Sequence, residues 1–201
     1  LALVEEALRL AESLQPGAAA STGLLEFYLD ALRLLPEPGG AARRAAQIIE
    51  QQVFPAIRRS GRGLFLEGSV GGAAEGQVDV RESIRAGRVL VRAGGQLGNE
   101  TYAAVGRSLL AAALALADAE GFLPARLTLA GGEPKPAQEP LAPEHVYPLV
   151  AALPYIPREY SLYRTLGPGS WVFTVARLEE VKVDATQQRF FFTFPAGDTH
   201  H

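Results

Sequence analysis

Two strongly helical segments joined by only two residues constrain the fold of this chain more than any other feature. They are Asp79–Leu97 and Glu100–Glu120, and Gly98 and Asn99 lie between them. So short a connection predicts a tight αα-hairpin. The second segment is apolar on nearly every side, and a helix of that kind is buried between neighbours. The hairpin therefore predicts a layered array of helices.

The ends of these two helices carry their own signals. Gly98 predicts a left-handed end to the first helix, and Asn99 predicts a cap for the second. At the start of the first helix, Asp79 and Glu82 have the three-residue spacing of a capping box. In that motif the Asp79 carboxylate accepts from the backbone N–H of Glu82, and the Glu82 side chain reaches back to the Asp79 backbone N–H.

Three further amphipathic helices precede the hairpin. Their apolar spacing places them at 2–14, at 22–35 and from about 41 to Pro55. Pro55 has no backbone N–H, so it kinks or ends the third of these helices. The glycine-rich segment 61–78 predicts a long ordered loop or a short β-hairpin.

One narrow stripe of the first hairpin helix holds Arg81, Arg85, Arg88 and Arg92. A phosphate-binding ridge and a solvated outer face are both open for this stripe. We favour the solvated face, with arginine used in place of lysine through genome composition, because Lys135 and Lys182 are the only lysines in the chain.

The composition of the chain changes after Gly121. Segment 122–157 holds eight of the fourteen prolines, which predicts loop apart from a short helix near 144–152. Strand-like runs follow at 171–175, 181–183 and 189–194, although 171–180 is also compatible with a last helix. We therefore divide the chain into a helical-hairpin domain at 1–166 and the truncated beginning of a β-sandwich-like module at 167–201.

Composition excludes several function classes. The net charge of the 201 residues is −3, so no bulk positive field attracts nucleic acid. No apolar run approaches the roughly 20 residues that span a bilayer, and we expect a soluble chain. Cysteine is absent, which excludes disulfides and thiolate chemistry but leaves bacterial periplasm, cell surface and cytoplasm open. No nucleotide-binding or metal-binding motif is present, and we expect neither a cofactor nor a metal.

Two groups of residues are candidates for chemistry. Asp79 and Glu82 lie at the N-terminal end of a helix, and we favour capping as their role. The proline-stiffened segment from Tyr155 to Tyr163 presents three tyrosines with Arg158 and Glu159, which suits a sugar ring, although a packed connection is favoured. Trp171 is more often a core residue than a ligand platform.

Four features of the chain carry a family resemblance. They are the serial hairpins, the Gly-Phe-Leu-Pro-Ala-Arg connection at 121–126, the acidic residues at helix ends and the following β-module. In these features the chain resembles the α/α-toroid, or six-hairpin glycosidase-like, proteins. The resemblance covers roughly residues 2–165. It implies an acid and a base that cleave glycosidic bonds, or equivalent residues that eliminate polyuronides. The positions that match are Asp79, Glu82 and Glu159 as catalytic groups, and Tyr155, Arg158, Tyr160 and Trp171 as sugar contacts.

Two hypotheses follow for function. The first is a fragment of a bacterial carbohydrate-active protein, a glycoside hydrolase or polysaccharide lyase if it is an enzyme, that binds an oligosaccharide or polysaccharide at the toroid mouth. The alternative is a non-catalytic helical-repeat interaction module with an attached β-domain. In both, the remaining domains of the polypeptide are partners. The enzyme hypothesis requires Asp79 or Glu82 to face Glu159 across one aromatic-lined cleft, with the carboxyl groups about 5–10 Å apart.

Overall fold

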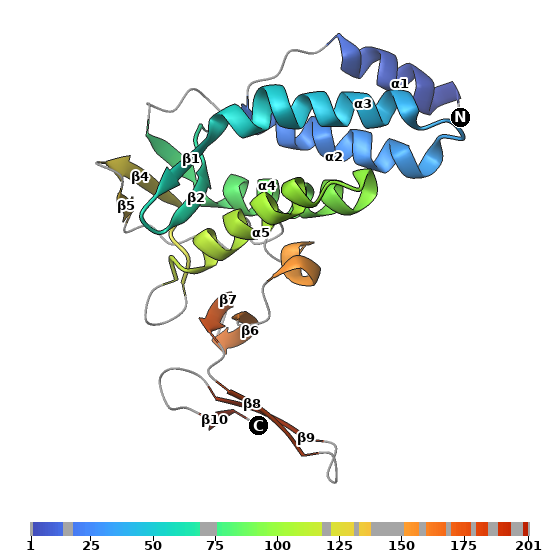
Figure 1. The fold of residues 1–201 in the computed structure, drawn as a ribbon. Coiled ribbons are helices and arrows are strands. Elements are labelled where there is room, and N and C mark those ends of the chain that lie inside the picture. Colours follow the sequence, from blue (N-terminus) through green and yellow to red (C-terminus); the bar gives the residue numbers. More distant parts are fainter. Residues whose placement is uncertain are drawn as a thin grey trace.

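The chain is mainly helical as far as residue 114, with short strands between residues 57 and 79, and further antiparallel strands follow (Figure 1). The structure is a computed structural model, and it describes residues 2–13, 18–68, 76–117, 122–130, 133–137, 151–156, 160–167, 170–177, 180–184, 189–193 and 199–200.

The helices lie close to where the apolar spacing places them. They are α1 (Ala2–Glu12), α2 (Ala18–Leu34), α3 (Gly39–Ile48), α4 (Val80–Leu97) and α5 (Glu100–Leu114). After α3 the helical hydrogen bonding continues through a π-helical segment, Ile49–Val53, and a 3₁₀ turn, Phe54–Ala56. The helix ends at this turn as Pro55 predicts. The second hairpin helix ends at Leu114 rather than Glu120.

The α4–α5 hairpin confirms its predicted signals. Gly98 has φ +66° and ends α4 in the left-handed conformation. The Asn99 side chain accepts from the backbone N–H groups of Thr101 and Tyr102, which caps α5. The two helices approach so closely that a Cβ built on Gly106 would lie 2.6 Å from the carbonyl oxygen of Gly87.

The strands form small antiparallel sheets. β1 (Ile57–Ser60) pairs with β2 (Gly63–Leu66), and β4 (Arg126–Ala130) pairs with both β3 (Gln77–Asp79) and β5 (Glu133–Pro136). Later in the chain β6 (Tyr160–Gly167) pairs with β7 (Ser170–Arg177), and β9 (Arg189–Thr193) lies between β8 (Glu180–Asp184) and β10 (Thr199–His200). The expected strands at 171–175, 181–183 and, as far as residue 193, at 189–194 are confirmed, and residues 171–177 are strand rather than the beginning of a last helix.

Two expected loops are strands instead. The proline-rich segment contains β4 and β5, and Pro134 and Pro136 lie in β5 at the edge of its sheet, where a missing N–H does least harm. Of the short helix expected near 144–152, only the helical residues 151 and 152 are described. The expected loop from Tyr155 to Tyr163 gives way to strand β6 at Tyr160.

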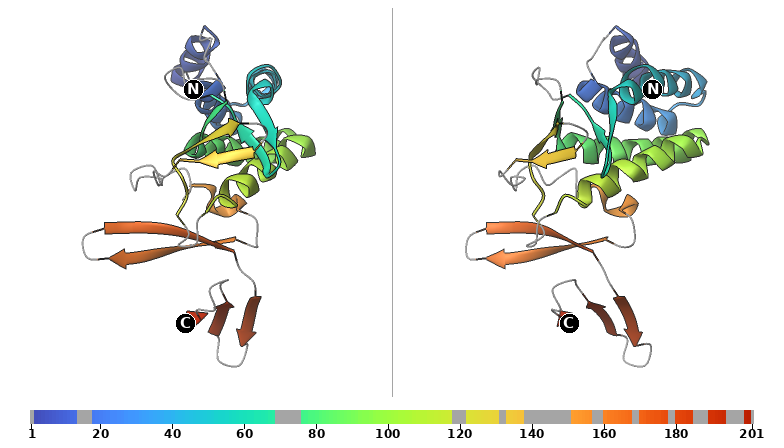
Figure 2. Two further views of the ribbon diagram at one scale, coloured as in Figure 1. Left: turned by 90° about the vertical axis from the view of Figure 1, so that its left-hand side faces the viewer. Right: turned by 60° about the vertical axis from the view of Figure 1, so that its left-hand side comes forward.

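This strand changes how the C-terminal part is organised. Gly167 pairs with Ser170 across the tip of the β6–β7 hairpin, so the boundary drawn at 166–167 falls inside one hairpin. Figures 1 and 2 show β6–β7 and β8–β10 beyond α5, on the side away from α3.

The core has two clusters that share α4 and α5. The first lies among the helices and the second lies between α4, α5 and the strands. On α5, Leu109 belongs to the first cluster and its neighbour Leu110 to the second, and both are fully buried. The predicted burial of this helix on several sides is therefore confirmed. Within the described ranges no helix is both long and apolar enough to cross a membrane.

Candidate functional site

Asp79 ends β3 and is the N-cap of α4, and its carboxylate has a structural role. Its Oδ1 accepts from the backbone N–H of Glu82 at 3.2 Å, and its Oδ2 lies 3.3 Å from Nη2 of Arg81. The backbone of Asp79 is also in register with Arg126 of β4. The Asp79 half of the predicted capping box is confirmed, and this carboxylate fixes the strand-to-helix junction.

Glu82 is buried, with 4% of its surface exposed. Its carboxylate accepts from the Thr22 hydroxyl of α2 at 3.4 Å, and Nε of Arg81 and Nη1 of Arg85 lie 3.5 and 4.0 Å away. Burial raises the pKa of Glu82, because desolvation of the charged form outweighs the two arginines. The side chain thus turns to the α2–α4 interface.

The arginine stripe of α4 is not a solvated outer face, and that interpretation is wrong. Arg88 reaches Glu26 of α2 at 2.5 Å and Arg92 reaches Asp30 at 2.5 Å. Arg85 also lies 3.4 Å from Glu26. The stripe is an ion-pair ladder between α2 and α4. The periodicity of α4 alone could not reveal it, because the acidic partners belong to another helix.

Hydroxyl groups that the sequence interpretation did not single out extend this polar interface. Ser21 donates to Oε1 of Gln52 at 2.6 Å, and the Ser83 hydroxyl accepts from the backbone N–H of Leu66 at 3.1 Å. Both serines are fully buried. Small polar residues inside apolar helical stripes were the only sequence signal for these links between α2, α4 and the neighbouring elements.

The tyrosine segment is described only in part. Tyr155 is half-buried and packs against the second core cluster. Arg158 and Glu159 lie outside the described residues. Tyr160 begins β6 opposite Arg177. Trp171 lies in β7 opposite Leu166. Of the three predicted catalytic carboxylates, the structure brings Asp79 and Glu82 together within one helical turn.

Contacts of the Glu67 side chain link the two ends of the glycine-rich segment. The Glu67 carboxylate accepts from the backbone N–H of Gly76 at 2.6 Å and pairs with Nε of Arg58 at 2.6 Å. Residues 69–75 between them lie outside the described part. In the described part no group of three or more His, Cys, Asp or Glu side chains is placed to hold a metal ion.

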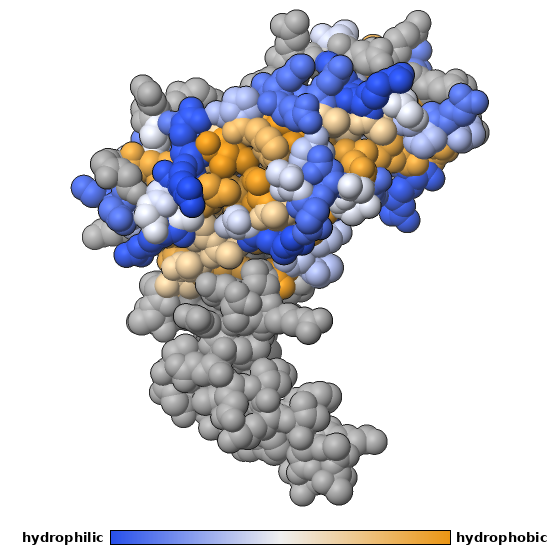
Figure 3. Space-filling view, in the orientation of Figure 1, coloured by the Kyte–Doolittle hydropathy of each residue, from blue (hydrophilic) through white to orange (hydrophobic). Residues whose placement is uncertain are grey.

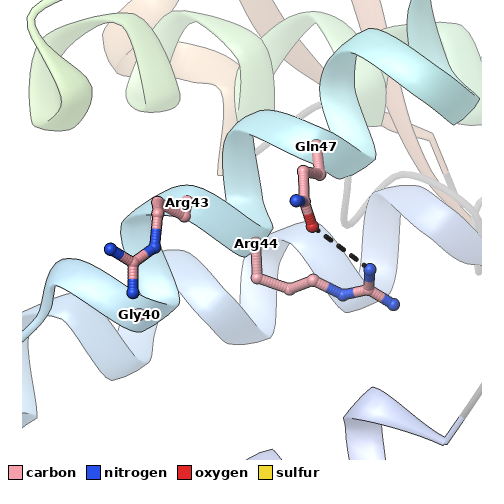
Figure 4. A pocket seen from close by; sticks show the side chains of 4 residues that line it. All are labelled: Gly40, Arg43, Arg44 and Gln47. Atoms are coloured by element: carbon pink, nitrogen blue, oxygen red, sulfur yellow. Dashed lines mark hydrogen bonds between the residues drawn. The ribbon is translucent and has the colours of Figure 1, made fainter.

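A hollow of about 380 Å³ lies on α3 (Figure 4). Gly40, Arg43, Arg44 and Gln47 line it. Nη1 of Arg44 donates to Oε1 of Gln47 at 3.4 Å, and Figure 4 shows the guanidinium groups of Arg43 and Arg44 directed to opposite sides.

A second surface feature is apolar, and we call it the hairpin face. It consists of half-buried side chains where the 3₁₀ turn, the β1–β2 hairpin and α5 meet: Phe54, Ile57, Leu64 and Val105. The Phe54 ring packs edge-on against Tyr102, whose hydroxyl donates to Glu50 at 2.7 Å. Burial and this acceptor raise the pKa of Tyr102 to about 12. Figure 3 shows apolar residues exposed in this region with hydrophilic residues around them.

No protein-family model, no curated protein and no solved structure matches this chain. The geometry of these surfaces therefore carries the functional proposal.

Proposed function

We propose that this chain is a non-catalytic interaction module whose hairpin face docks an acidic, amphipathic segment of a partner protein. The observation that carries the non-catalytic part is the use of Asp79 and Glu82. One caps α4, and the other is buried against Thr22 and two arginines. A group that transfers a proton to a substrate must be within hydrogen-bonding reach of it, and the burial of Glu82 opposes this.

The charge around the hairpin face supports an acidic partner. Arg58, Arg59 and Arg62 are exposed on β1 and its turn, beside the half-buried apolar side chains. Arg58 pairs with Glu67, whereas no ion pair joins Arg59 or Arg62 to a carboxylate in the described part of the chain. Complementary charge on a partner would speed its association and fix its register over the apolar residues.

The α/α-toroid hypothesis draws its support from the antiparallel packing of α2 with α3 and of α4 with α5. The strands β1 to β5 interrupt a simple series of hairpins. Within this hypothesis oligosaccharide binding depends on Tyr155 and its neighbours, because Asp79 and Glu82 have structural partners. We keep it as the second candidate on the observation that part of the Tyr155 side chain stays exposed.

A designed peptide tests the docking proposal. The probe is a fluorescent amphipathic helix with leucines on one face and glutamates on the other, and fluorescence anisotropy measures its binding. We expect saturable binding that weakens with salt, since exposed charges are screened. Replacing the glutamates of the peptide by lysines should weaken binding at least about tenfold.

Two charge-matched variants locate the surface. Arg59→Glu with Arg62→Glu should weaken binding about tenfold or more. Arg33→Glu with Arg43→Glu changes the net charge equally on exposed positions of α2 and α3, and should leave binding nearly unchanged. Equal loss in both variants, or no saturable binding by the unaltered chain, would reject the hairpin face as the docking surface.

A further inference from the structure

The arginines of α3 differ from those of α4 in their partners. Arg81, Arg85, Arg88 and Arg92 of α4 all pair with carboxylates. Helix α3 has the sequence GGAARRAAQI and contains no acidic residue. Across the described ranges no ion pair joins Arg43 or Arg44 to a carboxylate. Arg43 and Arg44 thus both line one hollow, with their guanidinium groups directed to opposite sides, and neither has a carboxylate partner in the described part of the chain.

The donors around this hollow are incompletely used. Oε1 of Gln47 accepts from Arg44, which leaves the amide NH₂ of Gln47 to donate to another group. Nε of Arg44 is buried, and no acceptor for it is present among the described residues. The same holds for Nε of Arg81 and of Arg88, whose guanidinium groups pair with carboxylates through their other N–H groups, so the donors of Arg44 open to an anion are its Nη groups.

The chemistry of these donors selects the class of ligand. A guanidinium group offers a planar fork of N–H donors that matches two oxygens of a phosphate group. The volume of about 380 Å³ falls within the range of small-molecule sites and is far larger than one water molecule needs. The hollow therefore has room for a phosphate group together with the molecule that carries it.

We propose that the hollow on α3 is a binding site for a phosphate group, held by Arg44 and the amide of Gln47, and that the exposed Arg43, which is directed to the other side in Figure 4, turns to join them. The ligand is a phosphate ester, either a soluble small molecule or a lipid headgroup. This site is separate from the hairpin face, and the phosphate proposal does not depend on the docking proposal.

Gly40 provides a way to block the hollow without removing charge. A Cβ built on this residue meets no atom within 4 Å, and its backbone is helical. A leucine would therefore extend into the open hollow rather than into the core. Leucine is also a better helix former than glycine, so the helix should not be weakened.

Isothermal titration calorimetry at low salt tests the site, with inorganic phosphate and with vesicles of phosphatidylcholine containing phosphatidic acid as probes. We expect saturable binding of at least one probe. Arg43→Ala with Arg44→Ala should weaken it at least about tenfold, and Gly40→Leu should do the same with all charges kept. The control Arg33→Ala with Arg126→Ala removes two exposed arginines that belong to neither proposed surface and should leave binding unchanged.

The outcomes separate the sources of the phosphate. Binding of inorganic phosphate points to a soluble ligand, whereas binding of the vesicles alone points to a lipid headgroup. If the alanine pair fails to fold by circular dichroism, Arg43→Lys with Arg44→Lys keeps the charge but loses the fork and should also weaken binding. Absence of saturable binding to both probes, or equal weakening by the Arg33 and Arg126 control, would overturn the proposal.

Discussion

Arg88 of α4 and Glu26 of α2 form a close ion pair, with Nη2 of Arg88 2.5 Å from Oε1 of Glu26, and only 11% of the arginine side chain is exposed. The two residues are 62 positions apart in the sequence. Their contact joins the second helix of the chain to the long hairpin. It shows that α4 uses its charged stripe for packing as well as its apolar one.

Removing one partner of this ion pair should destabilise the fold. Glu26→Gln leaves Arg88 largely buried with a weaker acceptor, and we expect a loss of about 2 kcal/mol in the free energy of unfolding, below the value for a fully buried pair because Glu26 is partly exposed. Urea denaturation measures the change. Glu100→Gln is the control, because the exposed pair of Glu100 with Arg107 should contribute less than about 1 kcal/mol. Equal losses would show that the α2–α4 ion pair is no stronger than a surface one.

The close approach of α4 and α5 leads to a prediction with a matched glycine control. Gly106→Ala adds a Cβ that would lie 2.6 Å from the Gly87 carbonyl oxygen and 2.7 Å from the backbone nitrogen of Val91. Since backbone atoms cannot move aside easily, we expect a loss of about 1–3 kcal/mol. Gly95→Ala in α4 meets no atom within 4 Å and should instead stabilise the helix by about 0.5–1 kcal/mol. Thermal unfolding of both variants checks the pair, and a stable Gly106→Ala protein would contradict the helix contact.

The buried Glu82 makes a prediction about pH. Its pKa is raised above the ordinary value of 4.5 because burial disfavours the carboxylate, so the folded chain holds this proton more tightly than the unfolded chain does. The stability that Glu82 contributes is therefore fully present below pH 4.5 and is lost as the pH rises through the raised pKa of the folded state.

Glu82→Gln isolates this effect, because the amide does not titrate. The stability of the variant relative to the unaltered chain should increase as the pH rises above 4.5 and then level off. Glu100→Gln, at an exposed position, should give a difference that changes little over the same range. Chemical denaturation at a series of pH values measures both. A relative stability of Glu82→Gln that falls with rising pH would show that the neighbouring arginines outweigh desolvation.

Local signals in the sequence predicted the parts of the fold that depend on neighbouring residues. The Asp79 cap, the left-handed Gly98 and the Asn99 cap are each satisfied within a few residues, so their residue types carry the information. The end of the α3 ladder near Pro55 is of the same kind.

Features that depend on distant residues were not predictable in this way. The face of α4 that holds Arg88 was expected to be solvated, because the sequence of α4 does not indicate that Glu26 of α2 pairs with Arg88. Strand β5 was missed because Pro134 and Pro136 suppress a strand prediction, yet an edge strand tolerates them. For the candidate site, the closeness of Asp79 and Glu82 was clear, whereas the burial of Glu82 against Thr22 required the packing of α2.

The oligosaccharide hypothesis leads to a testable prediction at Tyr155. The ring packs against the second core cluster and keeps an exposed part, so Tyr155→Ala removes both packing and a stacking surface. We expect it to lower the free energy of unfolding by about 1–2 kcal/mol, whereas Tyr155→Phe keeps the ring and should be nearly neutral. If the exposed part of the ring stacks on a sugar, a glycan array should retain the unaltered chain and Tyr155→Phe but lose Tyr155→Ala with Tyr160→Ala.

Circular dichroism separates the two roles of this ring in that experiment. A doubly substituted chain that keeps its spectrum but loses the glycan would assign the tyrosines to ligand binding, since a stacking platform acts on the ligand more than on the core. A chain that loses its spectrum would assign Tyr155 to the core instead. An unaltered chain that is retained by no glycan on the array would remove the carbohydrate hypothesis and leave the interaction module as the function to pursue.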